Sequence, residues 1–495
     1  MEDNNTYYQS RHFLRLLHRY EKAVSEGQVP YMEADELTDI AEYYMTGKQD
    51  AKANQAIQAA INMHPDSVDP QIFLARQKMF YGQLDEARNI IDSITEQDDL
   101  EVIYIRAELL IKEGRADEAS DFLQQQMSEM QDCLEDFLYN CTSIFMDYDQ
   151  WELAEEWMLQ LKETDPTHPR LPIVEAEILM GLDNYEDALP LLKEIIDEEP
   201  YNAEAWNLLA ETYVALEKYS EALEAADYAL AINPADTNPF LMKGNAYMND
   251  GQMGAAIENY TRYLESQPED LSVQISLCVC YTSEERYREA LALLDKAAQY
   301  ARKLPDREGD LPQIYQLQAV ALSRLGRIPE ALAAVAKARQ HFDEAETWKF
   351  DITEGDIYLQ IGKMKKAEDF FAKALSRSPE KGETLFNIAI LYSNAGYYDI
   401  AIDLLSDVWI IYGTEEGKFV VPHLANCHFH KFRETPEHSP KREKNLKLFL
   451  EYLQLAPYCD REATLFLFRD RFPGIQPEDY YAYAFKEAYG TFPKS

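Results

Sequence analysis

Apolar residues recur along much of the chain at a helical spacing that breaks and resumes at regular intervals. In one stretch, residues at i, i+3, i+4 and i+7 lie on one face of a helix: Trp206, Leu209, Ala210 and Tyr213. After a short break, small residues mark a second helix: Ala222, Ala226 and Ala229. Pro234 is expected to end this second helix, because proline cannot continue one. The pattern therefore predicts two helices joined by a tight turn.

The same pair of helices is repeated with a period of 34 residues. Units in the same register begin near the following positions: 135, 169, 203, 237 and 271. Looser copies begin near further positions: 34, 68, 100, 312, 348 and 382. A twelfth unit is expected to begin near 418 and to end at Pro457, with the segment TPEHSP interrupting its turn. The chain thus holds about eleven or twelve tandem units.

Small residues recur at fixed positions when each unit is counted from its first residue. Position eight and position twenty carry Ala or Gly in most units, as at Ala210 and Ala222. Two helices can cross closely only where such side chains meet, so these positions are expected to be buried. Cys141 and Cys278 occupy small packing positions and are expected in the core. A single hairpin cannot bury its apolar face alone, so neighbouring units must stack.

This pattern resembles the tetratricopeptide repeat family over about residues 34–457. The resemblance implies an all-α fold, a right-handed α-solenoid of stacked helix-turn-helix repeats with helical caps. It also implies that the first helix of each repeat lines a concave groove. The expected function is that of a non-enzymatic scaffold, which binds a peptide or protein segment in this groove.

Helical segments outside the repeats are expected to cap the stack. One covers 6–27, and two aromatic segments at 460–490 either seal the last repeat or dock a second chain. Extra residues at 301–312 form either a hinge or a tolerated loop insertion. The expected organisation is a capping helix, an acidic repeat block, a second repeat block, and a degenerate repeat with caps: 1–33, 34–304, 305–417 and 418–495.

Charge is distributed unevenly along the 495 residues, whose formal net charge is −42. Residues 1–300 hold 60 acidic and 21 basic residues, whereas residues 301–495 hold 29 acidic and 26 basic ones. Such a chain would repel the phosphates of nucleic acid and an anionic membrane surface. The expected partner is therefore a basic or neutral polypeptide, held in part by long-range attraction. The acidic block is either its binding surface or only a solubility coat.

Localisation and cofactor use are indicated only by missing patterns. The acidic N-terminus MEDNN does not resemble a secretory signal, and the six cysteines are scattered, so a cytoplasmic protein is expected. GTEEGKF lacks the spacing and the Ser or Thr of a phosphate loop, and no catalytic motif or cofactor is predicted.

One cluster could bind a metal ion. His423, Cys427 and His430 follow i, i+4, i+7 spacing, which places them on one side of a helix. The alternative to a scaffold is accordingly a metal-binding or enzymatic protein with its site at 423–489. Packing of these polar and small residues at a helix–helix contact explains the same spacing.

The predicted groove residues occupy positions five, nine and twelve of the first helices. They form a methionine and tyrosine stripe edged by glutamates: Glu42, Met45, Arg76, Met79, Tyr104, Glu108, Tyr139, Met146, Glu177, Met180, Asn207, Glu211, Leu241, Asn245 and Met248. Methionine suits adaptable contacts, so the stripe could hold apolar anchors between basic flanks. The other interpretation is that the methionines pack between neighbouring first helices.

Overall fold

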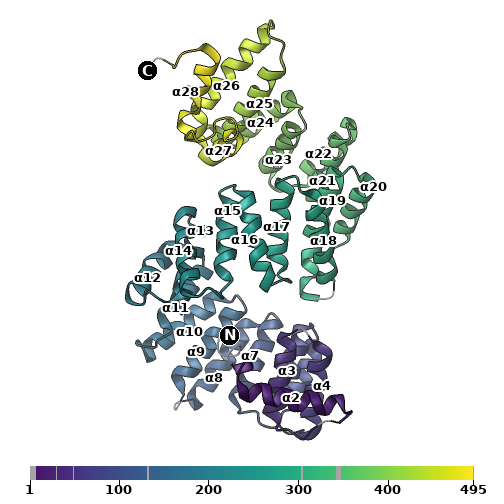
Figure 1. Ribbon diagram of the computed structural model, residues 1–495, viewed down its shortest axis with the longest axis vertical. Coiled ribbons are helices and arrows are strands. Elements are labelled where there is room, and N and C mark those ends of the chain that lie inside the picture. Colours follow the sequence, from purple (N-terminus) through teal and green to yellow (C-terminus); the bar gives the residue numbers. More distant parts are fainter. Residues whose placement is uncertain are drawn as a thin grey trace. The chain divides into compact units, whose positions relative to one another are not determined.

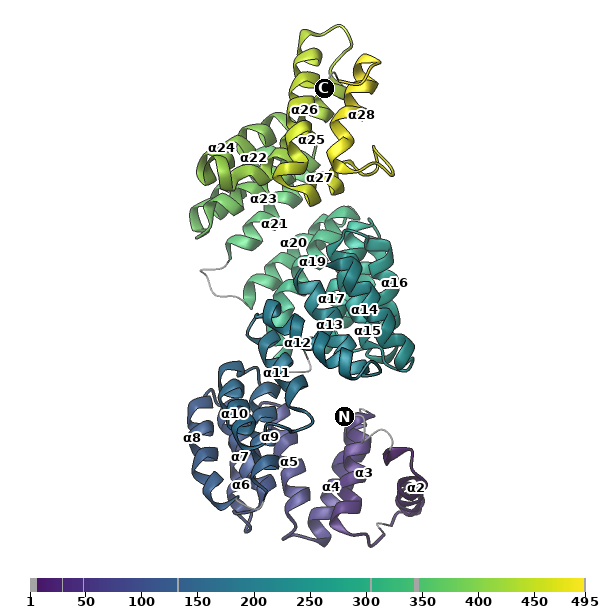
Figure 2. The same cartoon turned by 90° about the vertical axis from the view of Figure 1, so that its left-hand side faces the viewer.

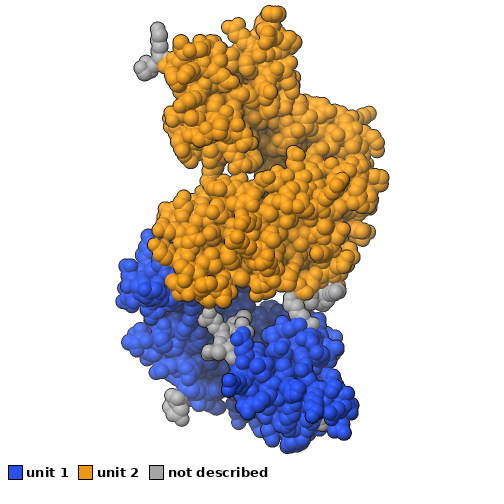
Figure 3. Space-filling model, viewed as in Figure 1, with its two compact units in different colours: residues 1–216 blue, residues 217–495 orange. Residues whose placement is uncertain are grey.

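The computed structural model describes residues 7–28, 30–47, 49–130, 133–302, 305–341 and 347–493. Within these residues the secondary structure consists of α-helices and short 3₁₀-helices, without a β-strand (Figure 1). The predicted all-α class is therefore confirmed. The chain divides into two compact units, residues 1–216 and 217–495, which are coloured separately in Figure 3.

The first unit contains a leading helix followed by helical hairpins. Its helices are α2 (Arg11–Ser25), α3 (Ala34–Thr46), α4 (Asp50–Met63), α5 (Val68–Phe80), α6 (Leu84–Ser93), α7 (Leu100–Lys112), α8 (Ala116–Gln126), η1 (Met127–Glu129), α9 (Leu134–Asp147), α10 (Trp151–Thr164), α11 (Leu171–Gly181), α12 (Tyr185–Glu198) and α13 (Ala203–Ala215).

The second unit continues the same pattern and ends in shorter helices. Its helices are α14 (Tyr219–Ile232), α15 (Asn238–Asn249), α16 (Met253–Ser266), α17 (Leu271–Ser283), α18 (Tyr287–Ala301), η2 (Pro305–Asp310), α19 (Leu311–Arg324), α20 (Ile328–Gln340), α21 (Trp348–Gln360), α22 (Met364–Arg377), α23 (Lys381–Asn394), α24 (Tyr398–Glu416), η4 (Gly417–Val420), α25 (Val421–Glu434), α26 (Pro440–Cys459), α27 (Arg461–Phe468), η5 (Pro477–Asp479) and α28 (Tyr480–Tyr489).

Each predicted repeat corresponds to one pair of helices, including the twelfth, which is formed by α25 and α26. The prediction that Pro457 ends the twelfth repeat is wrong, because this proline lies inside α26, which continues to Cys459. The leading helix is shorter than the predicted 6–27; residue 6 lies outside the described residues. Ser10 caps this helix by accepting a hydrogen bond from the Phe13 N–H at 3.1 Å.

Alanine at position twenty of the repeat is buried wherever it occurs. These residues are at most 1% exposed: Ala53, Ala87, Ala119, Ala154, Ala188, Ala222, Ala256, Ala290, Ala331, Ala367 and Ala401. Cys141 and Cys278 are fully buried as well, which confirms that they belong to the core. This burial agrees with the prediction that helices cross at small side chains.

The side chain at position eight of the repeat varies in size with the residue that faces it across the hairpin. Gly244 lies against Tyr260, and Gly355 lies against Phe371. A Cβ atom on Gly244 would come within 2.5 Å of the Tyr260 ring, and one on Gly355 within 2.3 Å of the Phe371 ring. Repeats with an aliphatic residue at position twenty-four, such as Leu192, tolerate alanine at position eight. The hairpins thus keep their volume by paired changes.

The turn between the two helices uses a left-handed residue at position fifteen. Glycine occupies it in several repeats, as at Gly326 with φ of +74°. Four other repeats place an acidic residue there, with φ between 54° and 58°: Asp149, Asp183, Glu217 and Glu285. This conformation costs a residue with a Cβ atom about 1–2 kcal/mol relative to its preferred region. Packing of the flanking helices therefore holds these four turns.

The C-terminal helices cover the last repeat. Phe468 of α27 and Tyr480 at the start of α28 are buried in one cluster with Phe449 of α26, and α26, α27 and α28 lie together in both Figure 1 and Figure 2. These contacts favour the sealing interpretation of the aromatic segments. No helix in the described part of the chain is long and apolar enough to cross a membrane.

Two predicted boundaries concern the middle of the chain. The insertion at 301–312 contains the short helix η2, while residues 303 and 304 lie outside the described residues. The compact units divide at 216/217, whereas the charge balance changes near residue 300. Compactness and charge are different criteria, so the predicted blocks 34–304 and 305–417 stay a prediction.

Candidate partner-binding face

Several pairs of successive first helices contact one another within each unit. In the first unit α3 contacts α5, α5 contacts α7, α7 contacts α9, and α11 contacts α13. In the second unit α17 contacts α19, and α19 contacts α21. Most second helices pack against the first helix of their own repeat, as α4 packs against α3, and of the next repeat, as α12 packs against α13. This packing supports the expectation that these first helices lie side by side within their own unit.

The N-terminal segment contacts the predicted binding positions of the first repeat. The Tyr8 hydroxyl donates a hydrogen bond to Glu42 at 3.3 Å, and the Tyr7 hydroxyl donates one to Asp39 at 2.5 Å. The Tyr8 ring also packs against Tyr43, with the centroids 5.6 Å apart. Burial raises the pKa of the Glu42 carboxyl. The chain itself therefore occupies the position next to Glu42.

Ion pairs between charged side chains connect the second and third repeats. The Arg76 guanidinium donates to Glu101 at 3.3 Å and to Glu108 at 3.1 Å. The Tyr148 hydroxyl donates a second hydrogen bond to Glu108 at 3.2 Å. Arg76 and Glu108, which sequence analysis assigned to the groove, are thus paired with each other. Glu108 is therefore already engaged by Arg76 and Tyr148.

The methionine and tyrosine stripe is divided between the core and the surface. Met79, Tyr104 and Met180 are buried, as expected if they pack between neighbouring helices. Met45 and Met146 are half-buried, and so is Tyr139, whose ring lies 5.2 Å from that of His168. A partner could reach only the half-buried members without unpacking the stack.

Two groove carboxylates have no partner among the described residues. Glu177 on α11 is half-buried, and Glu211 on α13 is exposed, yet neither forms an ion pair or a hydrogen bond there. Nearby Arg170 is instead engaged by Glu204, to which it donates at 2.5 and 2.8 Å. Burial and the charge of Glu204 raise the pKa of Glu177 from 4.5 to about 7. Desolvation raises the pKa of Glu211 in the same direction.

The remaining predicted positions fall at and beyond the unit boundary. Asn207 is half-buried in the first unit, and Leu241 is half-buried in the second. Asn245 accepts a hydrogen bond from the Tyr260 hydroxyl at 2.7 Å, and the same hydroxyl lies 3.6 Å from the Met248 sulfur. Asn245 and Met248 therefore orient a buried tyrosine within their own hairpin.

The three residues of the candidate metal cluster face different neighbours. The His423 ring packs edge-on against Phe386 at 5.1 Å, and the His430 ring stacks on Tyr398 at 5.1 Å. Cys427 is buried beside the Ser393 hydroxyl. Burial lowers the pKa of His423 to about 4, which keeps it neutral. Among the described residues, no group of three His, Cys, Asp or Glu side chains could hold a metal ion.

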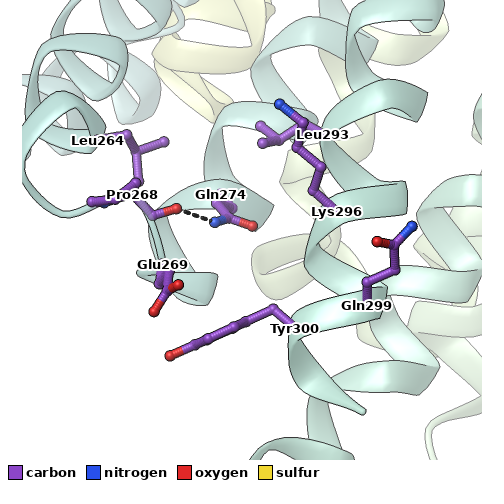
Figure 4. A pocket seen from close by; sticks show the side chains of 8 residues that line it. All are labelled: Leu264, Pro268, Glu269, Gln274, Leu293, Lys296, Gln299 and Tyr300. Carbon is purple, nitrogen blue, oxygen red and sulfur yellow. Dashed lines mark hydrogen bonds between the residues drawn. The ribbon is translucent and has the colours of Figure 1, made fainter. Parts of the chain in front are cut away.

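A cavity in the second unit was not anticipated from the sequence. It has a volume of about 470 Å³ and lies between the end of α16, the start of α17 and α18 (Figure 4). Its lining comprises Leu264, Pro268, Glu269, Gln274, Leu293, Lys296, Gln299 and Tyr300. The signal that could have found it is position four of the repeat, where Trp206 and Phe240 are followed by Gln274.

Comparisons with known proteins agree with the repeat register. A family model described as tetratricopeptide repeat matches residues 179–243, and a second one matches residues 241–306 and 317–381. These matches fall on helical hairpins of the predicted period. Residues 179–306 and 317–381 of this chain thus consist of tetratricopeptide repeats.

Several relatives carry the family name. The TPR repeat-containing protein MJ1428 of Methanocaldococcus jannaschii is 20% identical over 323 residues, which cover 61% of this chain and 56% of that protein. YpiA of Bacillus subtilis, also a TPR repeat-containing protein, is 22% identical over 305 residues, covering 55% of this chain and 71% of its own. The chain thus spans little more than half the length of MJ1428.

A solved structure of a tetratricopeptide repeat protein from Parabacteroides merdae is 17% identical. It covers 52% of this chain and 98% of its own, with a TM-score of 0.38. Tetratricopeptide repeat proteins generally mediate protein–protein interactions.

Proposed function

We propose that this tetratricopeptide repeat protein is a non-enzymatic scaffold that binds a polypeptide segment on the face formed by α9, α11 and α13. The segment would carry basic side chains for Glu177 and Glu211 and apolar anchors for half-buried side chains such as Met146. The observation that carries the proposal is the pair of unpartnered carboxylates on this face.

The neighbouring repeats explain why this part of the face is favoured. Glu42 already contacts Tyr8, and Glu108 already contacts Arg76 and Tyr148. A partner would have to displace these contacts before it could use either carboxylate. Glu177 and Glu211 require no such exchange, and a cation placed beside them would offset the cost of their desolvation.

A binding surface and a solubility coat differ in the hydration of their carboxylates. A carboxylate that only maintains solubility is well hydrated, and its pKa stays near the ordinary value. Glu177 departs from this behaviour, since its pKa is raised to about 7. Association through such groups should weaken as salt screens the attraction.

The experiment is affinity capture with the full chain at low and high salt, followed by identification of the bound polypeptides. The test variant carries Glu177→Lys and Glu211→Lys. The control carries Glu163→Lys and Glu194→Lys, which make the same change of charge at exposed positions of the second helices α10 and α12.

We expect partners that bind the wild-type chain and the control at low salt and that are lost with the test variant. Retention of every partner by the test variant would refute the proposed face. Loss of the same partners by the control would also refute it, because the effect would then come from the change in net charge alone.

A further inference from the structure

The side chain at position four of the repeat contacts the proline that precedes it in several repeats. The Trp206 indole N–H donates to the carbonyl of Pro200 at 3.0 Å. The Gln71 amide donates to the carbonyl of Pro65, also at 3.0 Å. Gln274 makes the same contact, with its Nε2 donating to the carbonyl of Pro268 at 2.6 Å. Position four therefore has a defined place beside the junction between repeats.

This contact fixes the orientation of the Gln274 amide. Its NH₂ group must face Pro268, because a carbonyl oxygen can only accept a hydrogen bond. The other atom of the amide, Oε1, is directed toward α18 (Figure 4) and has no hydrogen-bond donor among the residues that the structure describes. Gln274 is only 5% exposed. A buried acceptor without a donor is uncommon and costs about 1–3 kcal/mol.

The preceding repeat shows which chemical group belongs in this space. There, position four is Phe240, and position twenty-six is Arg262, whose guanidinium lies 5.5 Å from the centre of the Phe240 ring. In the next repeat, position twenty-six is again a cation, Lys296, but position four is Gln274. Both repeats therefore have a cation at position twenty-six, but only the first has an aromatic ring at position four. The cavity of about 470 Å³ lies beside Gln274 and Lys296.

Part of the remaining lining suits a flat apolar ring, and the polar residues Glu269, Gln299 and Tyr300 complete it. Leu264 and Pro268 form one side, while Leu293 and Lys296 extend from α18 on the other (Figure 4). The cavity volume lies within the range of ordinary ligand sites, roughly 300–1,000 Å³. Lys296 is exposed and forms no ion pair among the described residues, so it is available to lie over a ring.

We propose that this cavity binds an aromatic side chain that carries an N–H group, namely a tryptophan presented by a partner polypeptide. The indole N–H donates to Gln274 Oε1, the ring lies between Pro268 and Leu293, and Lys296 covers its face. The site lies outside the face formed by the first helices. It does not depend on the function proposed for Glu177 and Glu211.

The proposal is tested with two small probes and the full chain. N-acetyltryptophan amide keeps the indole N–H, whereas N-acetyl-1-methyltryptophan amide replaces it by a methyl group. Titrations followed by saturation-transfer NMR should show saturable binding of the first probe. The methylated probe should bind about tenfold more weakly, because it leaves Gln274 Oε1 without a donor.

Substitutions locate the binding in the cavity. Gln274→Trp should abolish binding, since the new ring would fill the cavity and donate to Pro268 as Trp206 donates to Pro200. Lys296→Ser should weaken binding by about two- to fivefold through loss of the cation–ring contact, without affecting the fold at this exposed position. Gln71→Trp is the matched control at the same repeat position in the first unit, and it should leave probe binding unchanged.

Three results would overturn the proposal. They are the absence of saturable binding, as expected if the cavity holds only water; equal binding of both probes; and unchanged binding by Gln274→Trp. A peptide with one tryptophan between alanines should bind at least as well as the amide. If the amide binds and the peptide does not, the site accepts a small molecule, and the proposal of a polypeptide partner is wrong.

Discussion

At the scale of single residues, position fifteen shows most clearly how local chemistry and packing compete. The turn requires a left-handed conformation, which glycine adopts without a steric penalty. Asp149, Asp183, Glu217 and Glu285 adopt it nevertheless, with φ between 54° and 58°. The helices on either side impose the conformation, and the strain reduces the stability of these repeats.

Replacing one of these residues by glycine should therefore stabilise the chain. We expect Glu285→Gly to raise the free energy of unfolding by about 0.5–1 kcal/mol, since relief of the left-handed strain exceeds the added entropy of the unfolded chain. The measurement is the midpoint of urea unfolding. Gly326→Ala is the opposite change at the same position and should lower that midpoint; a shift of both variants in one direction would contradict the argument.

Glu177 gives a prediction about pH. Its pKa is about 7 in the folded chain and near 4.5 when unfolded. Between these values the folded chain binds the extra proton, so Glu177 favours folding below about pH 4.5, and this contribution is lost as pH rises through about 7. Glu177→Gln should accordingly have its largest stabilising effect relative to wild type above pH 7.

Thermal unfolding of both proteins between pH 5 and pH 8 measures this difference. Glu163→Gln, at an exposed position of α10, is the control and should show a flat difference across the same range. A constant difference for Glu177→Gln would mean that its carboxyl is fully hydrated in the folded chain.

At the scale of the helical hairpin, stability depends on paired sizes at the crossing. Gly355 allows the Phe371 ring to approach so closely that an added Cβ atom would lie 2.3 Å from it. Gly355→Ala should therefore lower the free energy of unfolding by about 1–3 kcal/mol through overpacking.

The double variant Gly355→Ala with Phe371→Leu should recover most of this loss, because it recreates the alanine and aliphatic pair of other repeats. Denaturation midpoints of the two single variants and the double variant form the required cycle. Simple addition of the two single effects would show that the glycine serves another purpose than accommodating the ring.

At the scale of the whole molecule, the second unit contains a contact between a repeat and the distant C-terminal helices. Arg469, just after α27, donates a hydrogen bond to the Gly251 carbonyl at 2.8 Å. This carbonyl lies in the turn between α15 and α16. Burial raises the pKa of Glu462 on α27, and the nearby charges of Glu217 and Asp250 raise it further. One favourable hydrogen bond and several like charges therefore meet at this contact.

We expect Arg469→Ala to increase amide hydrogen exchange in α27 and in the turn around Gly251, because the hydrogen bond between them is lost. Glu462→Gln should reduce exchange in the same two segments by removing like-charge repulsion. Arg461→Ala, which removes contacts to Glu478 and Gln476 within the cap, is the control for general loosening of α27. Unchanged exchange around Gly251 in Arg469→Ala would show that the contact does not hold these segments together.

The repeat architecture could be predicted from the sequence because it depends on local, recurring chemistry. Ala210 and Ala222 mark a crossing, Pro234 marks the end of a hairpin, and the same marks recur in register. Pro457 was misinterpreted because the sequence does not show that α26 continues through it. Similarly, spacing alone placed His423, Cys427 and His430 on one side of a helix but could not show that each faces a different neighbour.

The sequence by itself determined the helical class, the period, the small residues in the core and the position of the first helices. Only the tertiary structure decided which groove residues are available. Glu108 is paired with Arg76 and Met180 is buried, whereas Glu177 has no partner in the described part of the chain. Periodicity assigns a side chain to a face of its own helix. Whether that side chain is paired, buried or accessible depends on neighbouring repeats, which is why the cavity beside Gln274 emerged only from the structure.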